Sequence, residues 1–489
     1  MVNGSVTSPK QDDVFVVYPL KFCTVTLSEV TASGKRLDAQ KYDVNLRATQ
    51  KRVLNNKFGV KHVIGDVDGF CSAYRPGICK RIFVEQDDDT VAMLTPSQIT
   101  DLHPKAEKYL PKRFCDSIPD WFVKSGEILL TCSGTIGNLS LVSKTLNGKC
   151  ISQNLIRIVP NNVEDTGYIY TYLKSSTGQL FLTRNNYGAV IQHIDPDHLA
   201  TIPIPDAPSE IKKRINDLIV SSYDLRDESN DLIDEATALL VNELQFPNIR
   251  DFDVALFKKN AGVDTFSVKL SDLAGRADAS YHVPIANAIV EHMKQHAAEV
   301  TTVGDSRVSK EIILPGRFKR IYVEEGYGRV FIGGKQLHEL DPTNKKYLSL
   351  VHHGDRIANQ LELHEGMTLI TCSGTIGKVT LVGKHWEKWT ANQHIIRVVP
   401  AIKDIAGYLS VFLASDYGYQ LITHYTYGSV VDEIDDTHVS NIPIPFLKNA
   451  DVQQRINELA LEANEKRYEA YKMEQEALRI IDKEVIYAK

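Results

Sequence analysis

The stretch "LLTCSGTIGNLSLV" at residues 129–142 returns as "LITCSGTIGKVTLV" at residues 369–382, with ten of the fourteen residues identical. The match continues at the same offset of 240 positions. "QNLIRIVP" (153–160) corresponds to "QHIIRVVP" (393–400), and "IPIP" (202–205) returns at 442–445. Several matches in one register do not arise by chance. The chain is therefore a tandem duplication of a unit of about 240 residues.

Each unit begins with a body that has mixed helix and strand signals. On either side of the glycines in "SGTIG", β-branched and apolar residues alternate, which predicts a strand, a turn and a second strand. "LIRIVP" and "IIRVVP" predict further strands, while "TGYIYTYLKSSTGQLFLT" and "AGYLSVFLASDYGYQLIT" each have the apolar spacing of a short helix. "IPIP" predicts an extended segment, because a residue before proline avoids helical geometry. We place the bodies at residues 1–205 and 247–446.

The tails of the units, residues 206–246 and 447–489, carry a heptad pattern. Apolar or small residues recur at alternating spacings of three and four, and a small residue occupies every seventh position of one seam. This pattern predicts a coiled coil, and the matching seams favour pairing of the two tails with each other, each helix being roughly 50 Å long. If the pairing is antiparallel, the bodies lie at opposite ends of a rod. Two unrelated helices, each packed on its own body, are the alternative. The seam residues are Ile215, Leu218, Ser222, Leu225, Ser229, Leu232, Ala236, Leu239, Ile456, Leu459, Ala463, Ala470, Met473, Ala477 and Ile480.

Charge and cysteine content limit the class of protein. The net charge of −6 is concentrated in residues 206–245, which hold ten acidic and four basic residues. The remainder is close to neutral, which is compatible with phosphate contacts without requiring them. The seven cysteines are odd in number and form no CxxC pair, so disulfides and a zinc site are not expected. The chain shows no apolar stretch of signal-peptide or membrane-helix length, and we expect a cytoplasmic protein without membrane contact.

The order of motifs resembles one known family. Each body contains "SGTIG", then "QN" or "NQH" before a strand, then "YG(A/S)V", then "IPIP" leading into "EIKKRI" or "DVQQRI". This order is similar to the target-recognition domains of specificity (S) subunits of type I restriction–modification systems, and the resemblance covers nearly the whole chain. The first tail departs from the family at "APSEIKKRI", which lacks the glutamine often found at that junction.

The resemblance implies a fold and a function. The expected fold is α+β, with two tandem α/β target-recognition domains separated by two long helices that pair as an antiparallel coiled coil. The expected function is recognition of a bipartite, asymmetric site in double-stranded DNA. Two half-sites along a duplex match a protein whose two bodies are related by an approximate two-fold axis. The family also implies docking of two adenine-N6 methyltransferase (modification) subunits and of restriction (motor–nuclease) subunits. S-adenosylmethionine, ATP and Mg are then expected in those partners, and no cofactor is expected in this chain.

Catalytic motifs are missing from the sequence, so we expect no catalytic residue and no metal ligand. It contains no (N/D)PP(Y/F), GxxxxGK(S/T) or HExxH. One nuclease-like string, Asp197 followed by Glu210 and Lys212, has no equivalent in the second copy. A single-chain DNA-binding nuclease, a specificity-like scaffold of a related phage-defence system, and an interaction scaffold without nucleic acid remain the alternatives.

Candidate DNA contacts follow from residue chemistry. The glycines of "SGTIG" are explained by a tight turn, and its hydroxyls suit phosphate contacts. Side-chain amides can pair with adenine, although a strand-entry turn explains the same residues. Base readers should differ between the copies. The candidates are Ser133, Thr135, Asn138, Gln153, Asn154, Arg184, Tyr187, Ser373, Thr375, Lys378, Asn392, Gln393, His424 and Tyr427, with "PKRF" (111–114), "GRFKR" (316–320) and "TNKKY" (343–347) as backbone contacts.

Overall fold

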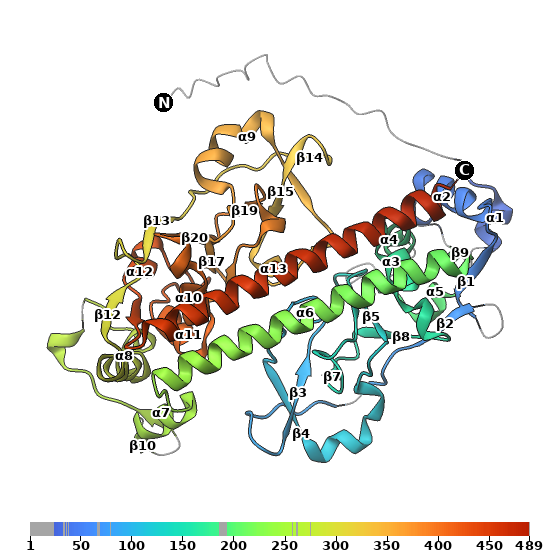
Figure 1. Cartoon of the computed structure of the whole chain (residues 1–489). Coiled ribbons are helices and arrows are strands. Elements are labelled where there is room, and N and C mark those ends of the chain that lie inside the picture. The colour runs from blue at the N-terminus through green and yellow to red at the C-terminus, as the bar shows by residue number, and fades with distance from the viewer. Residues whose placement is uncertain are drawn as a thin grey trace, which may run out of the picture.

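Two lobes flank a pair of long helices in the computed structural model (Figure 1). The structure describes residues 24–488 except 33–34, 36, 38, 66–68, 79, 185–192, 257, 261–262 and 274. The first lobe lies on one side of the helix pair and the second lobe on the other, displaced toward the opposite end (Figure 1). The duplication seen in the sequence therefore appears as an approximate two-fold arrangement.

The two tails form α6 (Ser209–Glu243) and α13 (Ala450–Ile480), which run antiparallel side by side (Figure 1). Near the middle, the Ser222 hydroxyl donates to the carbonyl of Ala470 at 2.9 Å. Ion pairs join Arg214 to Glu484 at 3.0 Å and Arg455 to Glu235 at 3.2 Å toward the two ends. The tails therefore contact each other along their length, as their matching seams predicted. The regular supercoil of a coiled coil stays a prediction.

The predicted seam lies inward. The small residues at every seventh position are completely buried, and this lets the backbones approach closely enough for the bond from Ser222 to the Ala470 carbonyl. The buried seam residues are Ile215, Ser222, Ser229, Ala236, Ile456, Leu459, Ala463, Ala470, Ala477 and Ile480, and the half-buried ones are Leu218, Leu225, Leu232, Leu239 and Met473.

The first lobe contains a six-stranded sheet in the order β6-β5-β8-β2-β1-β9 and a three-stranded sheet in the order β4-β3-β7. Its helices are α1 (Leu27–Ala32), α2 (Val44–Leu54), α3 (Thr166–Lys174), α4 (Ser176–Arg184) and α5 (Pro196–Leu199), and its strands are β1 (Val60–Ile64), β2 (Gly69–Tyr74), β3 (Thr90–Leu94), β4 (Lys108–Pro111), β5 (Ile128–Thr131), β6 (Leu139–Leu141), β7 (Cys150–Ile151), β8 (Leu155–Pro160) and β9 (Pro203–Pro205).

The second lobe contains sheets in the orders β18-β17-β20-β13, β12-β21 and β14-β16-β15-β19, and a separate β10-β11 pair precedes it. Its helices are α7 (Ile249–Leu256), α8 (Pro284–His296), α9 (Leu350–Arg356), α10 (Lys403–Ala414), α11 (Asp416–Thr423) and α12 (Asp436–Ser440), and its strands are β10 (Lys258–Asn260), β11 (Val263–Thr265), β12 (Glu299–Thr302), β13 (Ser309–Ile313), β14 (Tyr322–Val323), β15 (Gly328–Ile332), β16 (Lys346–Ser349), β17 (Thr368–Thr371), β18 (Val379–Leu381), β19 (Thr390–Ala391), β20 (Ile395–Pro400) and β21 (Pro443–Phe446).

The two lobes share their strand connections. The strands predicted around "SGTIG" are β5–β6 and β17–β18, and "IPIP" forms the edge strands β9 and β21. The single helix predicted after β8 and β20 is instead two helices in each lobe. The reason is a serine cap: Ser175 accepts from the backbone N–H of Gly178 at 3.2 Å, and Ser415 accepts from that of Gly418 at 3.1 Å. Each serine therefore starts a new helix.

Both lobes dock on the helix pair in the same way. The backbone N–H of Gly167 donates to Asn216 of α6 at 2.8 Å, and that of Gly407 donates to Asn457 of α13 at 2.8 Å. A Cβ at Gly167 would lie 2.6 Å from the Cα of Asn216, so only glycine permits this approach. Because each "(T/A)GY" segment meets an asparagine about two turns into the helix of its own tail, body and tail form one unit in each copy.

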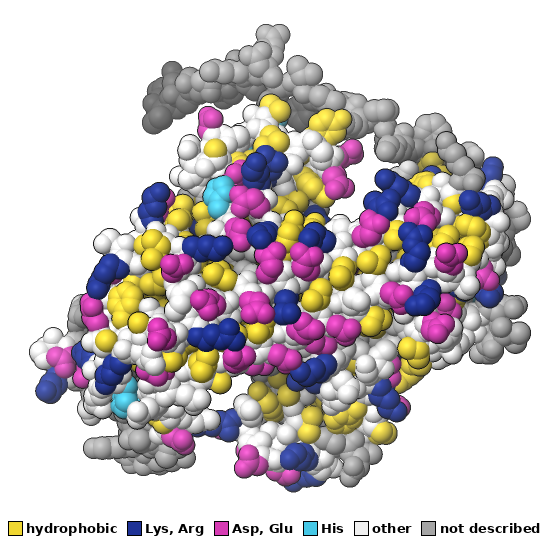
Figure 2. All heavy atoms as spheres, in the orientation of Figure 1, with side chains coloured by type: hydrophobic (Ala, Val, Ile, Leu, Met, Phe, Trp, Pro, Cys, Tyr) yellow, Lys and Arg dark blue, Asp and Glu magenta, His cyan; other side chains and the backbone are white. Residues whose placement is uncertain are grey.

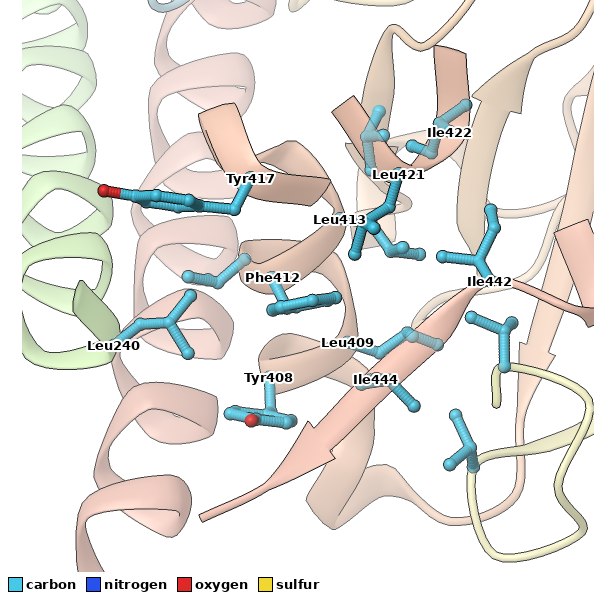
Figure 3. Packing of buried hydrophobic residues seen from close by; sticks show 14 of the residues in the cluster. Leu240, Tyr408, Leu409, Phe412, Leu413, Tyr417, Leu421, Ile422, Ile442 and Ile444 are labelled. Carbon is cyan, nitrogen blue, oxygen red and sulfur yellow. The ribbon is translucent and has the colours of Figure 1, made fainter. Parts of the chain in front are cut away.

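Each lobe also packs against the tail of the other copy. The core of the second lobe includes Leu240 of α6, which lies beside side chains of α10 and α11 such as Phe412 and Tyr417 (Figure 3). The core of the first lobe includes Ala477 and Ile480 of α13. Neither lobe has a complete core without both tails, so the two copies fold around a shared helix pair.

The lobes also meet at the middle of the helix pair. The backbone N–H of Leu102 donates to the carbonyl of His338 at 2.8 Å, and Asp101 and Glu339 form an isolated antiparallel bridge. These residues follow β3 and β15, the equivalent strands of the two lobes. The sequence predicted lobes at opposite ends of a rod; the structure adds a contact between them across the approximate two-fold.

Candidate nucleic-acid interface

The "SGTIG" loop is a tight hairpin in both lobes. Gly134 and Gly137 have φ values of +76° and +97°, and a Cβ at Gly137 would lie 2.6 Å from the side-chain oxygen of Gln179. The turn is closed by Thr131, whose backbone N–H donates to the carbonyl of Asn138 at 2.9 Å. Thr135 is exposed at the tip of the hairpin, so its hydroxyl is accessible to a phosphate.

In the second lobe, a neighbouring loop joins the hairpin. Glu433 forms antiparallel bridges with both Ser373 and Tyr427, so the "SGTIG" and "YGSV" segments lie together. Arg317, whose side chain is 81% exposed, pairs with Glu433 at 3.3 Å and brings a cation to the same place. In the first lobe, Ser133 forms the equivalent bridge with His193, whereas the predicted Tyr187 lies outside the described residues.

The predicted amides occupy the turn that enters β8 and β20. Asn392 accepts from the backbone N–H of His394 at 2.9 Å, the role that the Ser152 hydroxyl performs for Asn154 at 3.2 Å. The two asparagines therefore stand at different positions of this turn, and the strand-entry explanation accounts for Asn392. Gln393, by contrast, accepts from Arg320 at 2.8 Å.

Other candidates contact their own or the opposite lobe. Arg184 lies 3.8 Å from Asp43, at the start of α2. His424 is stacked on Tyr281 with 4.9 Å between ring centroids, and burial lowers its pKa. Burial raises the pKa of Asp101 at the lobe–lobe contact to about 6, and Lys378, the counterpart of Asn138, is close enough to oppose part of that rise. Thr375 remains exposed like its counterpart in the first lobe.

Each lobe has an exposed arm, and the sequence predicted a contact only for the basic run "GRFKR" (316–320) at the start of the second one. The first arm, residues 77–78 and 80–89, exposes Ile78 (84%) and Phe83 (43%) beside the cations of "KRIFVE" and ends in the acidic run "EQDDD" (85–89). The second arm, residues 316–327, exposes Tyr322 (42%) and Tyr327 (72%) beside "KRIYVE". Exposed apolar rings between basic residues are typical of nucleic-acid surfaces. The signal was present in the sequence, since the same motif occurs in both copies, but its exposure was not visible there.

The basic residues predicted to contact the DNA backbone differ in whether they are already engaged within the lobe. Arg113 of "PKRF" lies 5.4 Å from the centroid of the Phe114 ring, and Lys346 of "TNKKY" lies 5.4 Å from that of Tyr322 in the second arm. Lys345, from the same run, forms an ion pair with Asp341, whose side chain is only 5% exposed. Lys345 is therefore occupied inside the lobe.

The nuclease-like string does not form a recognisable site. Asp197 lies in α5 and Glu210 in the first turn of α6, with strand β9 between them. Among the described residues, no group of three or more His, Cys, Asp or Glu side chains is placed to hold a metal ion. Within the same residues, no helix is long and apolar enough to cross a membrane.

Comparison with known proteins places this geometry in context. No curated protein matches the chain. Structural relatives include a type I restriction–modification system S subunit from M. genitalium, with 13% identity, 88% of this chain and 95% of that chain covered, and a TM-score of 0.31. The HsdS subunit from Thermoanaerobacter tengcongensis has 14% identity, 82% and 91% coverage, and a TM-score of 0.26. The family model for the type I restriction modification DNA specificity domain matches residues 91–235 and 323–459, more than half of the chain. The chain therefore belongs to the family of type I restriction modification DNA specificity domains.

Proposed function

We propose that this chain is the DNA sequence-recognition subunit of a type I restriction–modification complex and binds a bipartite, asymmetric site. The observation that carries the proposal is the pair of lobes with the same strand connections, each presenting an "SGTIG" hairpin and an exposed arm in which an aromatic ring lies close to basic residues. The antiparallel helices relate the lobes by an approximate two-fold, which matches the symmetry of a duplex. One lobe reads one half-site.

Recognition divides between the hairpins and the arms. The hairpin hydroxyls and backbone N–H groups contact phosphate, which positions each lobe without reading sequence. The arms and the loops near them supply base contacts in the major groove. Arm residues differ between lobes, with Phe83 in the first and Tyr322 in the second, so the two half-sites differ. Affinity then depends strongly on salt, because phosphate contacts release counterions.

The outer faces of the helix pair dock the modification subunits. Figure 2 shows acidic and basic side chains covering the band formed by α6 and α13. The exposed face of α6 is mainly acidic and favours a partner with a basic surface. Its exposed acids are Glu210, Asp217, Asp224, Glu228, Asp231, Asp234 and Glu235.

Chemistry belongs to the partners in this proposal. The two modification subunits bind S-adenosylmethionine and methylate adenine N6, and the restriction subunits use ATP and Mg for translocation and cleavage. This chain selects the site and sets the distance between half-sites, and the complex acts in the cytoplasm. None of these partner activities requires a catalytic group from either lobe.

The test is reconstitution with the modification subunits on a library of random duplexes, followed by sequencing of the methylated fraction. We expect methylated adenines in two short, unlike sequences separated by a gap of fixed length. Methylation without sequence preference would contradict the proposal, and so would a complex that binds no DNA at any salt concentration.

Two alternatives have distinct outcomes. A single-chain nuclease would cleave DNA with a divalent cation alone and lose that activity in the Asp197→Asn and Glu210→Gln variants. A specificity-like scaffold of a related defence system would bind the same bipartite DNA and protect against phage, but the host genome would carry no methylated adenine at that site.

A further inference from the structure

One buried ionic cluster breaks the two-fold symmetry of the helix pair. Glu474 of α13 is completely buried and accepts hydrogen bonds from Lys174 (2.6 Å), Arg226 (2.6 Å) and the Tyr170 hydroxyl (2.7 Å). The Tyr223 hydroxyl donates to that of Tyr170 at 3.2 Å. Burial raises the pKa of Glu474, but Arg226 and Lys174 outweigh it and hold this pKa at about 2. The acid comes from the second copy, and its three partners and Tyr223 come from the first.

The equivalent position in the second lobe has no such cluster. The offset of 240 in the bodies and 241 in the tails identifies the counterparts. Lys174 corresponds to Ala414, Tyr170 to Ser410, Tyr223 to Asn464, Arg226 to Arg467, and Glu474 to Ile233. Arg467 donates to the Ser229 hydroxyl at 3.2 Å and forms no ion pair with any described carboxylate. Burial lowers its pKa to about 10.

These correspondences determine what each possible pairing of copies would bury. Two first copies would place Lys174 and Arg226 against Ile233, leaving two cations without an acid at both ends of the pair. Two second copies would place Glu474 against Arg467, one acid with one cation. The pairing seen in the structure gives Glu474 both Lys174 and Arg226. The observed pairing leaves one buried cation, Arg467, without an acid, whereas two first copies would leave two such cations at each end. Buried charge therefore opposes the pairing of two first copies most strongly.

We propose that the Glu474 cluster selects which copies of the duplicated unit pair: a first copy accepts a second copy and rejects another first copy. The second copy carries both Glu474 and Arg467 and is compatible with itself. An unpaired buried cation weakens an association by on the order of 100-fold, and two first copies would bury such cations at both ends. The cluster thus keeps two unlike lobes together. This inference does not depend on DNA binding, and its test contains no DNA.

The test uses the full chain with a protease site inserted between Ala261 and Gly262. After folding and purification, the chain is cut, held in mild denaturant so that the halves exchange, returned to buffer and analysed by native mass spectrometry. We expect pairs of one first and one second half, some pairs of two second halves, and pairs of two first halves at least roughly 100-fold below their statistical share. First–first pairs at their statistical share would overturn the proposal.

Three variants separate selection from simple stability. Ile233→Glu supplies the missing acid opposite Lys174 and Arg226, so first–first pairs should appear. Ala238→Glu adds the same charge to an exposed position of α6 and should change nothing. Replacing Lys174, Arg226 and Glu474 together by Met removes every charge of the cluster, so first–second pairs should persist and first–first pairs should rise. Exclusive first–second pairing in both the Ile233→Glu and the triple variant would refute selection by charge.

Discussion

Lengthening the helix pair should move the two half-sites apart by an amount that the helices determine. The change duplicates residues 215–235 in α6 and residues 456–476 in α13, which adds 21 residues, or three heptads, to each helix. Each lobe keeps its contacts with the helix pair, because one copy of each duplicated segment stays beside each lobe. The seam also keeps its phase. The contact between Leu102 and His338 is lost, so the helices alone hold the lobes.

The expected shift follows from two lengths and two rotations. Twenty-one residues lengthen each helix by ~31 Å, which corresponds to ~9 base pairs. Over that distance the duplex turns by nearly one full revolution, falling short by roughly 40°. The seam of an α-helix rotates about the helix axis by ~20° per heptad in the left-handed sense, or roughly 60° over three heptads. The shortfall of the right-handed duplex is a rotation in the same sense. The lobes are therefore displaced and rotated by nearly the same amounts as two half-sites that lie ~9 base pairs further apart. We expect the preferred gap to lengthen by ~9 base pairs.

A one-heptad variant provides the matched control. Duplicating residues 229–235 and 470–476 moves the lobes by ~10 Å, or ~3 base pairs. The duplex turns by roughly a third of a revolution over that distance, while the seam drifts back by only ~20°. The lobes then face the wrong sides of the DNA, and methylation should fall for every gap length.

The assay is methylation of a duplex library whose half-sites are separated by gaps of every length from zero to 25 base pairs, read by sequencing. Circular dichroism and native mass spectrometry establish that both variants fold and assemble. A folded three-heptad variant that still prefers the original gap would refute the reasoning, as would a one-heptad variant as active as the unaltered chain.

Three further predictions concern stability and affinity. Glu127→Met should lower the free energy of unfolding by about 3 kcal/mol in denaturant titration, because the buried Arg157 loses its carboxylate; an unchanged midpoint would contradict this. Burial raises the pKa of Asp101 to about 6 and of Glu339 to about 7, so ionisation destabilises the folded state as pH rises from about 4 to about 7. The Asp101→Asn, Glu339→Gln double variant should therefore raise Tm above pH 7 and leave it unchanged below about pH 4; an equal rise at both would show another cause. Lys319→Ala should reduce the slope of log K against log salt by about 1, measured by fluorescence anisotropy, and an unchanged slope would exclude a phosphate contact.

The architecture could be predicted because the repeat in the sequence defines both bodies and both tails. One offset of 240 aligned strands and turns in both bodies, and one heptad seam marked each tail. Pairing of the two tails followed from the matching seams, and Ser222 and Ala470, which meet in the structure, each occupy the small-residue position. The break of the helix after β8 was missed because Ser175 does not interrupt the apolar spacing, and its capping bond is visible only in three dimensions.

The candidate interface was harder to predict because the repeated motifs do not show which side chains are exposed or which partners they bind within the lobe. Asn392 matched a base reader by type, yet its oxygen caps a turn. The "KRIFVE" and "KRIYVE" segments recur in both copies, but their sequences do not show that rings such as that of Tyr322 are exposed. The Glu474 cluster was invisible for a different reason: its members come from three separate helices of the two copies.

The most direct test of two lobes reading two half-sites is selection of bound DNA from a fully random duplex library by the chain with its modification subunits. The unaltered chain should enrich two short, unlike sequences with a fixed gap. Replacing Arg81 and Phe83 by Ala in the first arm should weaken the sequence preference at one half-site and leave the preference at the other half-site unchanged. A single uninterrupted sequence, or equal loss at both halves, would contradict the account.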